Sequence, residues 1–74
     1  MWKTIFKIPK DLRSEIEVVC RDIKQKDNSF NFKISDKKLI IFSDSEKQAY
    51  ARGYWFKQKV DKRLLFRVES DIDG

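Results

Sequence analysis

The chain has 74 residues, a net charge of +5 from 17 Lys and Arg against 12 Asp and Glu, and an aromatic content of 14%. This length allows one domain, and the aromatic content argues against a disordered chain. There is one cysteine, Cys20, and no histidine. An intramolecular disulfide is therefore excluded, and a zinc site would lack ligands. We expect a small domain without a metal or cofactor.

The N-terminal part of the chain changes from the period of a strand to that of a helix. Residues 2–8 alternate between two faces, which predicts a strand. Pro9 ends this strand and can occupy the first turn of a helix, where its missing N–H is not needed. Apolar residues then recur at helical spacing, which predicts a first helix with one buried stripe. The stripe consists of Leu12, Ile16, Val19, Cys20 and Ile23.

The next segment predicts two further strands joined by a short turn. Phe30, Phe32 and Ile34 alternate with polar residues, as in a strand with one face in the core. Residues 35–38 form a polar connection. Residues 39–42 are apolar on both faces, which is typical of a central strand.

A second helix is expected from the end of this strand to about residue 60. Ser43 and Glu46 have the spacing of a capping box at its start. Its inner stripe consists of Ala49, Gly53, Phe56 and Val60. Because glycine weakens a helix, Gly53 indicates a close approach of this helix to the sheet or to the first helix.

The C-terminal part predicts a fourth strand over residues 63–69, followed by a short acidic tail over residues 70–74. The whole order is βαββαβ, which is the plan of ferredoxin-like α+β folds. We expect residues 1–69 to form one two-layer domain, with a four-stranded antiparallel sheet and both helices on one face. The first and third strands would be central.

The face of the sheet away from the helices is predicted to be basic. The alternation assigns to it Lys3, Ile5, Lys7, Asn31, Lys33, Leu65 and Arg67. Such a face either serves only as a solvated surface or attracts an anion such as a nucleic-acid backbone. RNA-recognition modules share the topology, but the aromatic pattern of their third strand is missing, so that family is not predicted.

The second helix predicts another contact surface. A helical wheel places Arg52, Trp55 and Lys59 almost opposite the inner stripe. Lys62 and Arg63 extend this basic cluster beyond the helix. Either another segment covers Trp55, or the indole anchors a protein interface or stacks on a base.

The residue types argue against catalysis, because no histidine can activate Cys20. No apolar run has the length of a signal-peptide core or a membrane span, so we expect a cytoplasmic protein without membrane contact.

The leading hypothesis is a regulatory module that binds single-stranded RNA or DNA, mainly through charge. The alternative is a protein-interaction module: a homodimer, or an inhibitor or adaptor that docks through the second helix or an edge strand. The candidate binding residues are Lys3, Lys7, Lys33, Arg52, Trp55, Lys59, Lys62, Arg63 and Arg67.

Overall fold

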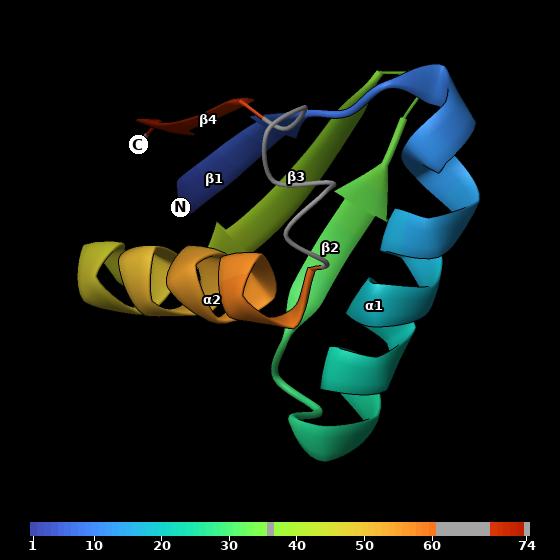
Figure 1. The fold of residues 1–74 in the computed structure, drawn as a ribbon. Helices are drawn as coiled ribbons and strands as arrows, with labels where there is room; N and C mark the ends of the chain where they lie inside the picture. Colours follow the sequence, from blue (N-terminus) through green and yellow to red (C-terminus); the bar gives the residue numbers. More distant parts are fainter. Residues whose placement is uncertain (36, 61–68, 74) are drawn as a thin grey trace.

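The computed structural model describes residues 1–35, 37–60 and 69–73, and it confirms the α+β class (Figure 1). In chain order the elements are β1 (Trp2–Lys7), the short 3₁₀ helix η1 (Lys10–Leu12), α1 (Arg13–Lys26), β2 (Asn31–Ile34), β3 (Lys38–Ser43), α2 (Glu46–Lys59) and β4 (Glu69–Asp73). Neither of the two α-helices in these ranges is long and apolar enough to cross a membrane.

An antiparallel sheet is built around β3, which pairs with β2 on one side and with β1 on the other. This confirms the central strand predicted from residues 39–42. The register places Ile40 opposite Ile5 of β1 and opposite Lys33 of β2. Antiparallel β4 joins the free edge of β1, which gives the order β2-β3-β1-β4.

The position of β4 differs from the sequence prediction. The strand predicted over residues 63–69 lies outside the described residues except for its last position. The structure instead has β4 at Glu69–Asp73, residues that the sequence assigns almost entirely to the acidic tail. Aspartate is depleted in strands, so local propensity favoured a tail. Pairing with β1 gives these residues an extended backbone despite that propensity.

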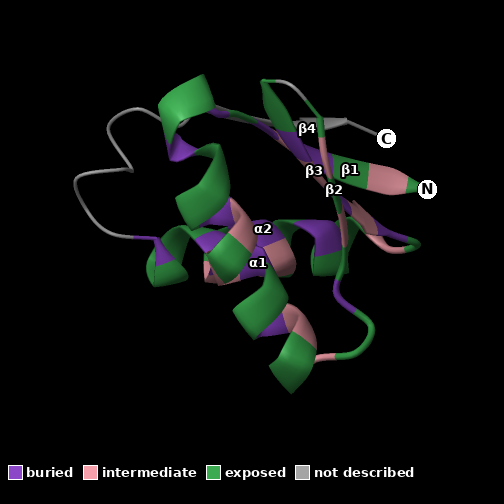
Figure 2. Cartoon of the chain, turned by 90° about the vertical axis from the view of Figure 1, so that its right-hand side faces the viewer, coloured by how far each residue is buried: buried purple, intermediate pink, exposed green. Residues whose placement is uncertain are grey.

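Both helices lie on the same side of the strands, as Figure 2 shows. The predicted stripe of α1 is correct: Ile16, Cys20 and Ile23 are buried, and Val19 packs against the core. The stripe of α2 is also correct, because Ala49, Gly53, Phe56 and Val60 are all buried. The rings of Phe6 and Phe56 meet with their centroids 4.8 Å apart, which joins β1 to α2 in the core.

The start of α2 corrects the predicted capping box. The N-cap is Ser45, whose Oγ accepts a hydrogen bond from the backbone N–H of Gln48 at 3.3 Å. Ser43 is the last residue of β3, so the helix begins later than the box predicted. The hydroxyl of Ser43 accepts from the N–H of Ser45 and donates to Gln48 Oε1, each at 3.2 Å.

Candidate nucleic-acid interface

The face of the sheet opposite the helices, called the open face below, has an apolar centre bordered by lysines. Along β1 and β3, exposed or half-buried residues of this face alternate with buried or half-buried residues of the other face. Along β2, exposed residues alternate with the half-buried Phe32 and Ile34, which pack against the core. The half-buried residues of the open face are Ile5, Ile40 and Phe42. Its exposed residues are Lys3, Lys7, Asn31, Lys33 and Lys38. These three strands contain no acidic residue.

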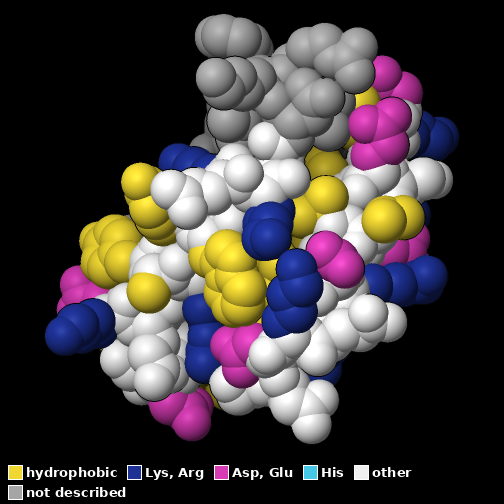
Figure 3. All heavy atoms as spheres, turned by 60° about the horizontal axis from the view of Figure 1, so that its bottom comes forward, with side chains coloured by type: hydrophobic (Ala, Val, Ile, Leu, Met, Phe, Trp, Pro, Cys, Tyr) yellow, Lys and Arg dark blue, Asp and Glu magenta, His cyan; other side chains and the backbone are white. Residues whose placement is uncertain are grey.

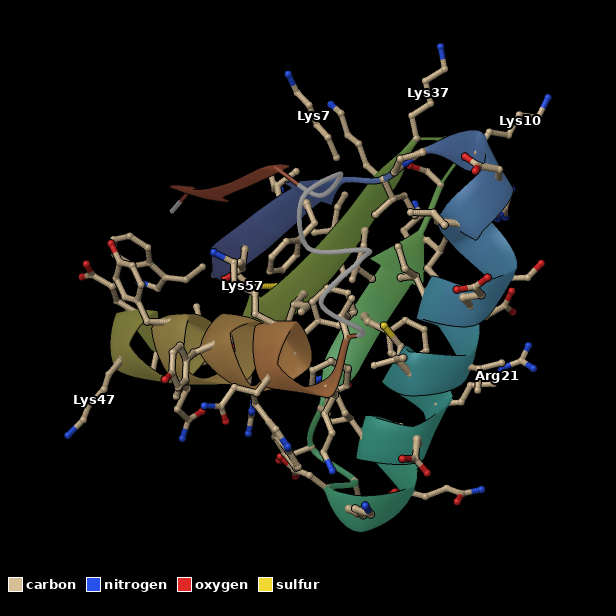
Figure 4. The ribbon with its side chains drawn as sticks, in the orientation of Figure 1. Lys7, Lys10, Arg21, Lys37, Lys47 and Lys57 are labelled. Carbon is tan, nitrogen blue, oxygen red and sulfur yellow. The ribbon has the colours of Figure 1, made fainter. Side chains whose placement is uncertain are left out.

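Three of the nine predicted site residues, Lys3, Lys7 and Lys33, thus lie on the open face as expected. Lys38 was missed, because the sequence suggested that it belonged to the turn. It is the first residue of β3 and lies opposite Lys7. Figure 4 shows Lys7, Lys10 and Lys37 projecting outward at this same end of the sheet, where β1 ends and β3 begins.

The strands of the open face differ in their distance from the acidic strand β4. The register of β4 places Asp73 opposite Lys3 and Glu69 opposite Lys7. Lys33 on β2 and Lys38 on β3 lie two and one strands away from β1. Lys33 and Lys38 thus lie on strands that do not pair with the acidic segment of β4.

Arg52 does not form the free outer cation that the helical wheel predicted. Its side chain is only 15% exposed, and its Nε lies 3.6 Å from Asp27 Oδ2. A second guanidinium nitrogen donates to Ser29 Oγ at 2.8 Å. The wheel gave the angle of Arg52 relative to the sheet but not the position of α1, whose C-cap residue Asp27 lies beside Arg52. Arg52 therefore fastens α2 to the end of α1.

Asp27 is held in its ionised form by the same cluster. The Ser29 hydroxyl donates to Asp27 Oδ1 at 2.6 Å, and the Ser29 backbone N–H donates to it at 3.0 Å. These hydrogen bonds, with a smaller contribution from the charges of Arg52 and Lys24, lower the pKa of the Asp27 carboxyl. The carboxylate thus remains available to Arg52 in mildly acidic solution.

Trp55 is also less exposed than predicted, because it is half-buried and packs against the hydrophobic core. Lys59 is exposed near the end of α2. The remaining predicted site residues, Lys62, Arg63 and Arg67, lie outside the described residues. The structure therefore does not bring Arg52, Trp55 and Lys59 together as a free surface.

The exposed aromatic residues of α2 are instead Tyr50 and Tyr54, which are 55% and 65% exposed. They are four residues apart and hence neighbours along one flank of the helix. Figure 3 shows the molecule from below the view of Figure 1, where hydrophobic, basic and acidic side chains are interspersed. This view shows no extended field of one charge, in contrast to the residue composition of β1, β2 and β3.

The thiol of Cys20 is fully buried, and this burial raises its pKa to about 12. A buried protonated thiol is a poor nucleophile. Within the described ranges no three His, Cys, Asp or Glu side chains are grouped so that they could hold a metal ion.

A small open pocket of about 250 Å³ lies at the end of the open face where β3 stops. Phe42 of the open face forms part of its lining, together with polar residues of the loop before β2 and of α2. Sequence reasoning did not identify this pocket, because it brings together segments that are far apart along the chain.

Comparison with known proteins finds no matching family model, no significant match among curated proteins and none among solved structures.

Proposed function

We propose that the protein is a small regulatory module, without enzymatic activity, that binds single-stranded RNA or DNA on its open face. The observation that carries this proposal is the apolar centre of Ile5, Ile40 and Phe42 with exposed lysines around it. Lysines neutralise phosphates, and a flat surface with an aromatic ring lets bases stack whatever their sequence. Charge would supply most of the affinity and little sequence preference.

The proposal includes the ferredoxin-like arrangement for the whole chain. The strand order β2-β3-β1-β4, antiparallel pairing and two helices on one side support it. In this arrangement no helix covers the open face. The proposal also includes a cytoplasmic location, which agrees with an unpaired cysteine in a reducing compartment.

The test is a titration of a labelled oligonucleotide of about 12 nucleotides, followed by fluorescence anisotropy at several salt concentrations. The informative variant is Lys33→Gln/Lys38→Gln, which removes two cations from the half of the open face far from β4. Each lost phosphate contact should reduce the slope of log K against log salt by about 0.7 and weaken binding at low salt.

The matched control is Lys26→Gln/Lys47→Gln, which changes the net charge equally but alters exposed residues of the helices. Figure 4 shows Lys47 projecting from α2 away from the strands. The control should retain the slope of the unmodified protein. Equal losses of affinity and salt slope in both variants would show that net charge alone attracts the oligonucleotide. The open face would then not be the binding surface. Absence of binding by the unmodified protein would refute the proposed function.

A protein-interaction module remains the second candidate, and the exposure of Tyr50 and Tyr54 favours it. Tyrosine is enriched where protein interfaces carry most of their binding energy. Sedimentation over a range of concentrations tests a homodimer through this flank of α2. A dimer that Tyr50→Ser/Tyr54→Ser converts to a monomer, in a protein that binds no oligonucleotide, would establish this candidate instead.

A further inference from the structure

The pocket beside Phe42 is small, adjoins the open face and has a mostly polar lining. Its volume of about 250 Å³ is below the roughly 300–1,000 Å³ of sites for drug-sized molecules. Phe42 belongs both to the pocket lining and to the open face, where it lies opposite Lys3 and Asn31. A strand that crosses the open face would therefore reach the pocket without leaving the surface.

The polar groups in the pocket lining supply both donors and an acceptor. Gln48 Oε1 accepts a hydrogen bond from Ser43, which leaves its amide NH₂ as a donor. Asn31 Oδ1 accepts from Lys24 Nζ at 3.4 Å, so its amide NH₂ is also a donor. Asp44 is exposed, and it forms no hydrogen bond or ion pair with the part of the chain that the structure describes. Its carboxylate is the acceptor.

The charges in the pocket argue against a phosphate as its ligand. Arg52 lines the pocket, but its guanidinium is already matched by Asp27 and bonded to Ser29. Asp44 adds a negative charge to the same lining. The pocket therefore suits a neutral ligand with its own donors and acceptors, and phosphates are better placed on the lysines of the open face.

We propose that this pocket takes one base of the single strand bound on the open face and prefers a base with an exocyclic amine, such as cytosine, to uracil. This inference rests on the proposed function. An exocyclic amine can donate to the carboxylate of Asp44, as acidic side chains accept from cytosine N4. Uracil presents a carbonyl oxygen at that position, which a carboxylate repels. The amides of Gln48 and Asn31 can donate to the ring nitrogen and carbonyl of the same base.

The test compares oligo(C) with oligo(U) of equal length at low salt. Uracil has a carbonyl in place of the exocyclic amine that Asp44 would contact, and an N–H in place of the ring nitrogen that would accept from Gln48 or Asn31. The unmodified protein should bind oligo(C) about tenfold more tightly. In Asp44→Asn the preference should fall severalfold, because an amide can accept from the amine of cytosine or donate to the carbonyl of uracil. Asp22→Asn is the matched control: it removes the same charge from an exposed residue of α1 and should retain the preference.

The outcomes separate this inference from the proposed function. Equal binding of oligo(C) and oligo(U), or an unchanged preference in Asp44→Asn, would overturn the base site and leave the open face as a binding surface. If neither strand binds, the proposed function fails. A titration with free nucleosides then tests whether the pocket binds a base by itself. Shifts of the Phe42 and Gln48 NMR signals with cytidine but not with uridine would support it, and no shifts would overturn it.

Discussion

Gly53 of α2 lies directly against Thr4 of β1. A Cβ placed on Gly53 would come within 2.8 Å of Thr4 Cγ2, closer than real Cβ contacts allow. The hydroxyl of Thr4 also donates to the backbone carbonyl of Ala49 at 2.8 Å, one turn earlier in α2. The helix and the strand are thus in close contact at a position where any side chain larger than glycine must displace Thr4, as the mid-helix glycine predicted.

Gly53→Ala should destabilise the protein although alanine is the better helix former. The substitution gains about 1 kcal/mol of helix propensity. The added methyl group must displace Thr4, which is held by its bond to Ala49, and overpacking of this kind costs about 1–3 kcal/mol. Urea denaturation should show a lower free energy of unfolding than in the unmodified protein.

Thr4→Ser provides the partner for a double-mutant cycle, because serine keeps the hydroxyl and removes the methyl group that meets Gly53. Gly53→Ala should cost less in the Thr4→Ser background. Equal costs in the two backgrounds would show that the two residues do not meet.

Arg52→Met should lower the free energy of unfolding by about 1 kcal/mol, because it removes the hydrogen bond to Ser29 while retaining most of the aliphatic stem. The control is Lys47→Met on an exposed position of the same helix, which should change stability by less than about 0.5 kcal/mol. A similar result for both variants would mean that Arg52 does not fasten α2 to the end of α1.

Asp27 should contribute to the dependence of stability on pH in acid. Its pKa is lower in the folded protein than its ordinary value of 3.8. The contribution is therefore fully present above that value and is lost as the pH falls below it through the folded pKa. Acidification in this range should destabilise the unmodified protein more than Asp27→Asn. Parallel pH profiles would contradict the role of the Ser29 hydrogen bonds.

Cys20 should resist alkylation in the folded protein. Its thiol is fully buried and remains protonated up to a pKa of about 12, so almost no thiolate is present at neutral pH. Iodoacetamide labelling followed by mass spectrometry should be slow in native buffer and fast in denaturant. Rapid labelling of the native protein would show that α1 opens readily or packs differently.

The sequence predicted correctly the features that depend on local periodicity. It failed for side chains whose surroundings are determined by tertiary contacts. The buried stripes and the lysines of β1 and β2 follow from local spacing, since a strand alternates and a helix repeats about every 3.6 residues. The surroundings of Arg52 and Trp55 depend on the packing of α2 against α1 and the core, which a helical wheel of one element does not contain. Lys38 was missed because turn residues and strand residues look alike at a hairpin.

The central claim, that a single strand lies on the open face, is tested most directly by methyl NMR during titration with a single-stranded oligonucleotide. Ile5 and Ile40 lie on the open face, whereas Leu39 and Ile41 are fully buried on the side of the helices. The account predicts that the methyl signals of Ile5 and Ile40 shift and that added salt reverses the shifts, while those of Leu39 and Ile41 stay in place. Unchanged methyl signals of Ile5 and Ile40 at saturating oligonucleotide, or shifts confined to Leu39 and Ile41, would contradict it.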